Sequence, residues 1–466
     1  MSSSAAILQS PPWKWEDLRS TVLASEEGAV LERDRLLREK GEGLPHADND
    51  LRLFGTSAEP RVTFYKDRAS WCPYCQKVWI MLEEKKIPYR IEKINMRSYG
   101  DKPREFLAKV PNGLLPAIEL DGKLQTDSIS IMMNLERTFT GPHHPKMWPD
   151  GDSEELERAS SLMRLERQLF SDWCGLVFRP SYGQKQSRVM FEETLDVVEG
   201  QLGQVPGPFF LKQGISIVDL QFVTHIERML ASVPYWAGFK IRGGEGSARW
   251  PNIDAWFDAF ECMPSYMASK SDYYTHVQDI PPQYGPGYDE PGSGAEQLAA
   301  VINGVDEVKG WRLPLPPLNP DEDVEPVKPF LLKGERVDRV EAAYKLTQNH
   351  AAVVKFAARG MGKRGSKRFQ APLADPYAEP NEAYYSDVDS ALRTIARVLL
   401  EPSDNAWQQP EFQLQLADTG ASDEDKRAVA LCLNYLKRRI GVPRDMAYPA
   451  ARQLRAHLTW AENQLV

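Results

Sequence analysis

Trp71-Cys72-Pro73-Tyr74-Cys75 stands between a short β-type run at residues 61–65 and a helical run that begins at the proline. Two cysteines separated by two residues can close a small disulfide ring or hold a metal ion. A structural zinc site needs four ligands, and the chain has no second cysteine pair of this kind. The strand–helix setting therefore favours a redox pair over a metal site.

The first cysteine of this motif occupies a position that activates thiols. Cys72 directly precedes Pro73, and proline is favoured at the first position of a helix. A helix N-terminus presents unpaired N–H groups and a partial positive charge, which stabilise a thiolate. Cys75 follows one turn later, and Lys77 adds positive charge nearby. We predict Cys72 as the nucleophile and Cys75 as the resolving thiol, with two ordinary buried cysteines as the alternative.

The residues around the motif alternate between strand and helix patterns. Periodicity and turn signals predict strands and helices in the order βαβαββα. The expected strands cover 61–65, 89–95, 115–120 and 123–126, and the expected helices cover 73–86, 103–110 and 128–139. The first strand–helix–strand unit implies a parallel strand pair with its helix packed on the sheet.

The rest of the chain reads as mostly helical. We predict five segments: an N-terminal helical extension at 1–58, the α/β domain at 59–142, an all-α domain at 152–277, a proline-rich connector at 278–329 and a helical extension at 330–466. The expected helices lie at 15–40, 154–178, 186–202, 216–231, 253–263, 337–359, 387–400, 423–440 and 448–465.

Composition excludes several classes of function. The chain has 466 residues and a net charge of −9, which gives no general reason to bind nucleic acid or an anionic membrane. No apolar run reaches the length of a transmembrane helix. Five cysteines is a low and odd number, which favours a reducing compartment over a disulfide framework. We predict a cytoplasmic protein, with the plastid stroma as the alternative because the chain starts with a serine-rich stretch.

Two places downstream of the motif carry groups suited to a peptide-like ligand. Pro116 opens a strand after Leu115, and a cis bond there would turn the Leu115 backbone N–H and C=O outward. Asp127 and Ser128 precede an apolar helix, where either residue can cap the helix. The same helix start can also bind a carboxylate, while Asp127 can pair with an ammonium group.

Together these pieces resemble the N-terminal, thioredoxin-like domain of the glutathione transferase superfamily, with a glutaredoxin-style CPYC motif. The stretches that carry the resemblance are WCPYCQKVWIMLEEKKIPY, KVPNGLLPAIE and TDSISIM, in the expected order. Ser216 and Asp219 resemble the capping motif of the family's second domain, a capping box with Asp in place of Glu. The resemblance implies a thioredoxin-like α/β domain, an all-α transferase domain and a mostly helical C-terminal extension. Long-tailed forms of this kind resemble those of cyanobacteria and plastids.

The resemblance implies a glutathione site around the motif. The first thiol of the motif would face the glutathione sulfur. Leu115, before a cis Pro116, would pair its backbone with the cysteinyl part of glutathione. Asp127 and Ser128 would hold the γ-glutamyl end. Lys109 matches the lysine that omega-like members place near the glycyl carboxylate, and a solvent-facing lysine is the alternative.

Cysteine-type members of the superfamily carry out thiol transfer, deglutathionylation or dehydroascorbate reduction. We therefore predict a metal-free, glutathione-dependent thiol transferase or oxidoreductase that acts on mixed disulfides or small oxidised substrates. Conjugation of glutathione to electrophiles is the alternative enzyme, and a non-catalytic scaffold is the alternative from another class. The expected partners are glutathione and a small-molecule or protein-disulfide substrate. A homodimer and a protein partner for the C-terminal extension are further candidates.

Three smaller groups of residues have weaker signals. Trp173, Phe178 and Tyr182 are candidates for a hydrophobic substrate pocket, although such residues more often belong to a core. Cys174 and Cys262 are expected to be buried as small hydrophobic residues. A basic cluster is expected to be a solvated helix end and loop, with RNA, phosphate or an acidic partner as the alternative. It consists of Lys355, Arg359, Lys363, Arg364, Lys367 and Arg368.

Overall fold

A mixed sheet carries the cysteine motif. The computed structural model describes residues 13–466 apart from 152, 181, 290, 366–371, 404 and 419. Within this range the sheet has the strands β1 (Leu51–Arg52), β2 (Val62–Asp67), β3 (Tyr89–Ile94), β4 (Ala117–Leu120) and β5 (Lys123–Thr126). The strand order is β1-β3-β2-β4-β5, with β2 and β3 parallel and the other pairs antiparallel. The predicted order of strands and helices is confirmed, and the parallel pair forms where it was expected.

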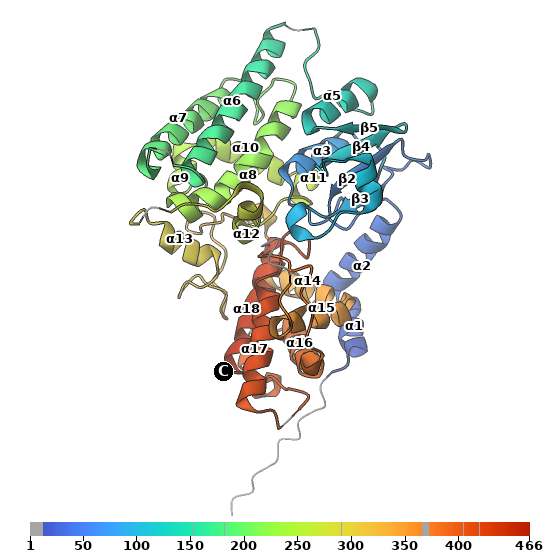
Figure 1. Cartoon of the computed structure of the whole chain (residues 1–466), viewed down its shortest axis with the longest axis vertical. Coiled ribbons are helices and arrows are strands. Elements are labelled where there is room, and N and C mark those ends of the chain that lie inside the picture. The colour runs from blue at the N-terminus through green and yellow to red at the C-terminus, as the bar shows by residue number, and fades with distance from the viewer. Residues whose placement is uncertain are drawn as a thin grey trace, which may run out of the picture.

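Helices cover both faces of this sheet. They are α3 (Pro73–Glu84), α4 (Arg104–Lys109) and α5 (Ser128–Thr138). The α3 helix is buried along most of its length because it lies between the sheet and a second, helical domain (Figure 1). The α4 helix packs on the other face, where Phe106 and Val110 meet Tyr65 of β2. The edge strand β1 was not predicted from the sequence, because two residues are too short for a strand pattern.

The helical domain follows and shares its core with the sheet domain. Its helices are α6 (Ser153–Val177), α7 (Gln184–Leu202), α8 (Ile217–Ala237), α9 (Glu245–Arg249), α10 (Pro251–Glu261), α11 (Pro264–Met267) and α12 (Tyr273–Tyr284). The central helix α8 is buried on nearly all sides. Ser216 and Asp219 form the predicted capping box at its start. The fold class predicted from the sequence, an α/β thioredoxin-like domain followed by an all-α domain, is confirmed.

The two ends of the chain meet in a third unit. Its helices are α1 (Trp15–Ala24), α2 (Glu26–Glu39), α14 (Glu335–Gln348), α15 (His350–Ala357), α16 (Tyr385–Leu400), α17 (Asp423–Lys437) and α18 (Tyr448–Asn463) (Figure 1). We call this unit the terminal helical body. Leu18 and Val22 are fully buried in its core, and such burial stabilises a fold by about 1.5–3 kcal/mol per side chain. The indole N–H of Trp15 also donates to Asp389 at 2.7 Å.

Some helix boundaries differ from the predicted ones for local reasons. The helix expected at 15–40 breaks at Ser25, whose extended backbone lets its hydroxyl cap α2 through the N–H of Gly28. The α12 helix continues past residue 277, where the sequence predicted the connector to begin. The connector also contains a helix, α13 (Ala295–Ile302), so it is not extended throughout.

Candidate active site

Cys72 lies at the start of α3, as predicted. It is the N-cap residue, with an extended backbone, and Pro73 takes the first helical position. Cys72 therefore stands at the positive end of a twelve-residue helix. Both cysteines are free and largely covered, with 6% of Cys72 and 1% of Cys75 exposed. A nucleophile with so little exposure can be reached only by a narrow or flexible substrate.

The backbone before Cys72 is fixed by buried charged groups. The N–H of Trp71 donates to the Asp67 carboxylate at 2.6 Å. The carbonyl of Trp71 accepts from the guanidinium of Arg228 at 2.5 Å, and the same guanidinium donates to Gln76 at 3.0 Å. Arg228 belongs to α8 of the helical domain and is 1% exposed. Sequence reasoning missed Arg228, although a charged residue inside an otherwise apolar helix is a signal that could have found it.

Cys75 is a poor nucleophile in this structure. Burial raises the pKa of its thiol well above the ordinary value, and its hydrogen bond with Cys72 acts in the same direction. A thiol must lose its proton to attack a disulfide. The geometry therefore gives the two cysteines unequal roles, with the N-cap position belonging to Cys72 alone.

Lys77 does not supply the full positive charge expected from the sequence. Its side chain is completely buried, and its ammonium group donates to the side-chain oxygen of Gln221 at 2.8 Å. Burial lowers the pKa of Lys77 to about 7. The expected charge is thus only partly present near neutral pH, because the ammonium group is removed from water between the two domains.

The buried Lys77 should make stability depend on pH. Its pKa is lowered in the folded chain, so above about pH 7 the unfolded chain binds more protons and stability rises with pH up to the ordinary lysine range. Lys77→Met removes this dependence. We expect the free energy of unfolding of the native chain, relative to Lys77→Met, to rise by about 1.4 kcal/mol per pH unit above neutrality. Urea unfolding of both proteins across this range measures it, and a constant difference would contradict it.

The other predicted glutathione residues lie on neighbouring loops. The Leu115-Pro116 peptide bond is cis and directly precedes β4. Asp127 is the N-cap residue of α5 and accepts from the N–H of Ser130 at 2.9 Å. Asp127 is exposed, whereas Ser128 is buried at the start of the helix. The predicted capping by Asp127 is therefore confirmed, while binding of a ligand by these residues stays a prediction.

Lys109 is engaged within the sheet domain. Its ammonium group pairs with Glu119 at 2.8 Å and donates to the hydroxyl of Tyr65 at 2.8 Å. The hydrogen bond with Glu119 raises the pKa of Lys109 above its ordinary value. These partners belong to β4 and β2, on the sheet face that α4 covers. Two of the three donors of the ammonium group are thus engaged within the domain, and contact between Lys109 and glutathione stays a prediction.

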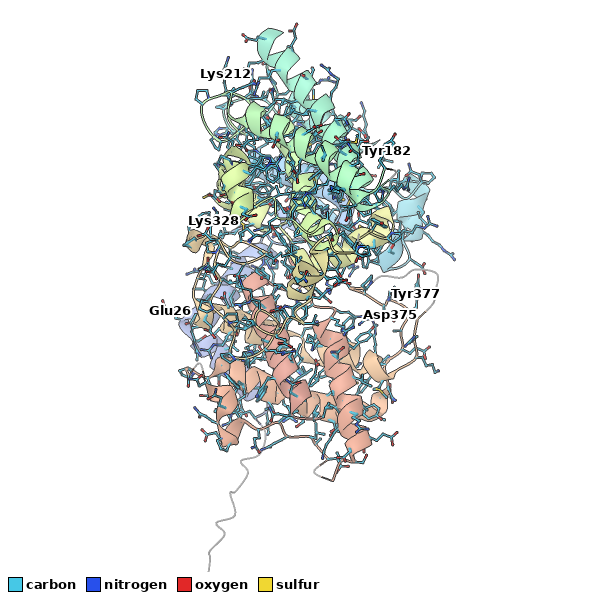
Figure 2. All side chains as sticks on the ribbon, turned by 90° about the vertical axis from the view of Figure 1, so that its left-hand side faces the viewer. Glu26, Tyr182, Lys212, Lys328, Asp375 and Tyr377 are labelled. Atoms are coloured by element: carbon cyan, nitrogen blue, oxygen red, sulfur yellow. The ribbon has the colours of Figure 1, made fainter. Side chains whose placement is uncertain are left out.

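The aromatic candidates of the helical domain separate into core and surface. Trp173 is fully buried and donates to Ser232 at 2.8 Å, so it is a core residue. Phe178 is partly buried and stacks on Tyr284 of α12 with ring centroids 5.7 Å apart. Tyr182, labelled in Figure 2, is exposed at the surface beyond the end of α6. Tyr284 was not predicted from the sequence as part of this aromatic group, because the residue lies in the stretch predicted as a proline-rich connector.

Two expectations about single residue types need correction or restriction. Cys262 is exposed and not buried, because it follows the last residue of α10 as its C-cap. In the basic cluster, Arg359 donates to the carbonyl of Asp375 at 3.0 Å, and Lys363 pairs with Glu379 at 3.2 Å. Lys367 and Arg368 lie outside the described residues. Two of the described basic side chains, Arg359 and Lys363, therefore already have partners within this chain.

The described residues were also compared with the requirements of a membrane span and of a metal site. No helix among them is long and apolar enough to cross a membrane. The same part of the chain contains no group of three or more His, Cys, Asp and Glu side chains that could hold a metal ion.

The chain matches two domain models of one family. Residues 71–138 match the glutathione S-transferase N-terminal domain, and residues 160–259 match the glutathione S-transferase C-terminal domain. Over these residues the chain is similar to the glutathione S-transferase superfamily. Its class is that of a glutathione transferase or thiol oxidoreductase enzyme. The terminal helical body lies outside both models.

Individual relatives match the same part of the chain. "Protein IN2-1 homolog A" of Oryza sativa subsp. japonica is 26% identical over 231 residues, which cover 49% of this chain and 86% of that protein. "Glutathione S-transferase DHAR2" of Arabidopsis thaliana is 28% identical over 169 residues, which cover 36% of this chain and 72% of that protein. The crystal structure of glutathione transferase Omega 3C from Trametes versicolor is 26% identical with a TM-score of 0.39, covering 46% of this chain and 91% of that one.

Proposed function

We propose that the chain is a glutathione-dependent thiol–disulfide oxidoreductase that acts on small mixed disulfides through Cys72. The observation that carries the proposal is the position of Cys72 as N-cap residue of α3, inside the segment that matches the glutathione S-transferase N-terminal domain. A tyrosine or serine at this position would assist conjugation, whereas a cysteine can itself form a disulfide with glutathione.

The proposed reaction uses two thiol–disulfide exchanges. The Cys72 thiolate attacks the glutathionyl sulfur of a mixed disulfide, so the substrate S–S bond breaks and a Cys72–glutathione disulfide forms. The substrate leaves as a thiolate and takes up a proton. The thiolate of a second glutathione then attacks the glutathionyl sulfur on Cys72, which releases oxidised glutathione and restores the Cys72 thiolate. Overall, one mixed disulfide and one glutathione thiol give one substrate thiol and one oxidised glutathione, so the substrate sulfur is reduced and the sulfur of the incoming glutathione is oxidised.

Several residues of the same sheet domain support a glutathione site. The backbone of Leu115 precedes the cis Pro116, and the N-terminus of α5 brings together Asp127 and Ser128. We propose that these groups bind the cysteinyl and γ-glutamyl parts of glutathione. The small exposed fraction of Cys72 favours a small substrate over a folded protein.

A direct assay tests the proposal. The full chain is mixed with glutathione and a mixed disulfide of glutathione with a small thiol, and formation of oxidised glutathione is followed. We expect turnover that requires glutathione. Conjugation of glutathione to an aromatic electrophile is measured in parallel. Rapid conjugation without disulfide reduction would contradict the proposal and favour a conjugating transferase, and absence of glutathione binding would favour a scaffold.

Cys75→Ser should retain most of this activity. The Cys75 thiol is buried and its pKa is raised, so glutathione in solution is the better resolving nucleophile. We expect the rate at millimolar glutathione to stay within about tenfold of the native rate. Steady-state assays at several glutathione concentrations measure it. Complete loss of turnover would show instead that resolution passes through Cys75.

A further inference from the structure

A loop of the terminal helical body lies directly against the residue before Cys72. We call residues 441–446, between α17 and α18, the tail loop. The indole N–H of Trp71 donates to the carbonyl of Val442 at 3.0 Å, and both groups are buried. The guanidinium of Arg444 lies over the Trp71 ring at 4.8 Å from its centroid. Trp71 is therefore in contact with a part of the chain more than 300 residues away.

The approach of the tail loop depends on a glycine. A β-carbon added at Gly441 would lie 2.5 Å from Cζ2 of Trp71, well inside van der Waals contact. Any other residue at this position would force the loop and the indole ring apart. The surfaces of Trp71 and the tail loop therefore fit without room for a methyl group.

The terminal helical body also contacts the start of α12, through the tail loop and through α18. The N–H of Val442 donates to the hydroxyl of Thr275 at 3.0 Å. Arg455 of α18 pairs with Asp272 at 2.6 Å, and neither side chain is exposed. These contacts hold the loop in one place relative to the helical domain, because a buried pair and a buried hydrogen bond are costly to break.

Trp71 is thus held at every polar group and across its ring. Asp67 accepts from its backbone N–H, and Arg228 donates to its carbonyl. Val442 and Arg444 hold the indole from the tail loop, and Tyr99 packs edge-on against the ring at 5.1 Å. The next residue in the chain is Cys72, so the position of its thiol depends on the position of Trp71.

We propose that the tail loop is a positioning element for Cys72, with Val442 and Arg444 acting through Trp71. The expected effect on turnover rests on the proposed function, whereas the contacts between the tail loop and Trp71 do not. A misplacement of about 1 Å in a reacting group can reduce a rate by about a hundredfold. When the loop contact is weakened, the motif gains freedom, and the covered thiol becomes easier to reach while its alignment for disulfide exchange is lost.

The test uses full-length variants and two readouts. Trp71→Phe removes only the indole N–H and the second ring, Arg444→Met removes the guanidinium, and Gly441→Ala introduces the crowding methyl group. Glutathione-dependent turnover gives kcat and KM. Alkylation by iodoacetamide, followed by mass spectrometry of the Cys72 peptide over a range of pH, gives the accessibility of the thiol. We expect kcat to fall about tenfold or more with little change in KM, while Cys72 alkylation becomes several-fold faster.

Matched controls separate positioning from loss of structure. Gly420→Ala lies in the same terminal helical body, and its added methyl group meets no atom closer than 3.4 Å. It should leave both readouts unchanged. Cys432 is fully buried in the core of that body, so its alkylation marks unfolding. A variant in which Cys432 becomes reactive is excluded as unfolded. If Gly441→Ala is excluded in this way, Trp71→Phe and Arg444→Met test the proposal.

Opposite changes in turnover and in Cys72 alkylation, with Cys432 protected, would support the proposal. Native alkylation rates and native kcat in Trp71→Phe and Arg444→Met would overturn it. If the native chain itself shows no glutathione-dependent turnover, the proposed function fails. The alkylation comparison still tests whether the tail loop positions Cys72.

Discussion

Replacing Cys72 by alanine should abolish glutathione-dependent reduction of a small mixed disulfide. The reaction needs a sulfur at the N-cap position of α3, and no other thiol of the motif can take its place, because Cys75 lies one turn inside the helix and is buried. Loss of a covalent nucleophile typically lowers kcat by about a thousandfold or more. The measurement is the rate of oxidised glutathione formation at saturating glutathione, corrected for the uncatalysed exchange.

The control for this substitution is another cysteine. Cys262→Ser removes an exposed thiol that lies beyond the end of α10 and should keep the native rate. Binding of glutathione to Cys72→Ala by calorimetry shows whether the site survives. Turnover in Cys72→Ala within a few-fold of the native chain would refute the assigned role of Cys72.

Replacing Arg455 by methionine should destabilise the chain by about 3–5 kcal/mol, because it leaves the Asp272 carboxylate buried without its cation. Methionine preserves much of the arginine volume, so the loss is mainly one of charge and hydrogen bonds. Arg455 also donates to the carbonyl of Ile440 at 2.8 Å and lies over the rings of Tyr274 and Trp311. Urea unfolding followed by tryptophan fluorescence measures the effect.

An exposed ion pair provides the comparison. Arg90 pairs with Glu59 at 2.7 Å, but the two side chains are 45% and 78% exposed. Arg90→Ala should therefore cost no more than about 1 kcal/mol. Equal losses in the free energy of unfolding of the two variants would contradict the prediction. The buried Arg455–Asp272 pair would then stabilise the chain no more than an exposed ion pair does.

The parts of the site that could be predicted from the sequence are those set by local chemistry. A proline after Cys72 and an aspartate before an apolar run mark helix starts, and in the structure Cys72 and Asp127 are the N-cap residues of α3 and α5. The strand–helix order around the motif follows from periodicity over short windows. These signals depend only on residues that are close in the sequence, so the helix starts and the strand–helix order could be predicted without knowledge of distant contacts.

The parts that could not be predicted depend on contacts between distant residues. The residues next to Lys77 in the sequence do not indicate that it is buried against Gln221. The residues next to Trp71 likewise do not indicate its hydrogen bonds with Arg228 and Val442. The sequence predicted no helix at 273–284 and placed the start of the proline-rich connector at residue 278, yet Pro281 and Pro282 fall in the last turn of α12. The edge strand β1 exists only because β3 offers it a partner.

The core shared by the two ends of the chain has a consequence for synthesis. Leu18 and Val22 emerge from the ribosome before residues 340–465, which share their buried core. In topological terms the transferase-like domains are an insertion within the terminal helical body. At about 5–20 residues per second, the first helix waits on the order of tens of seconds for its partners. The catalytic module can fold during that interval, and the ends of the chain then close over it last.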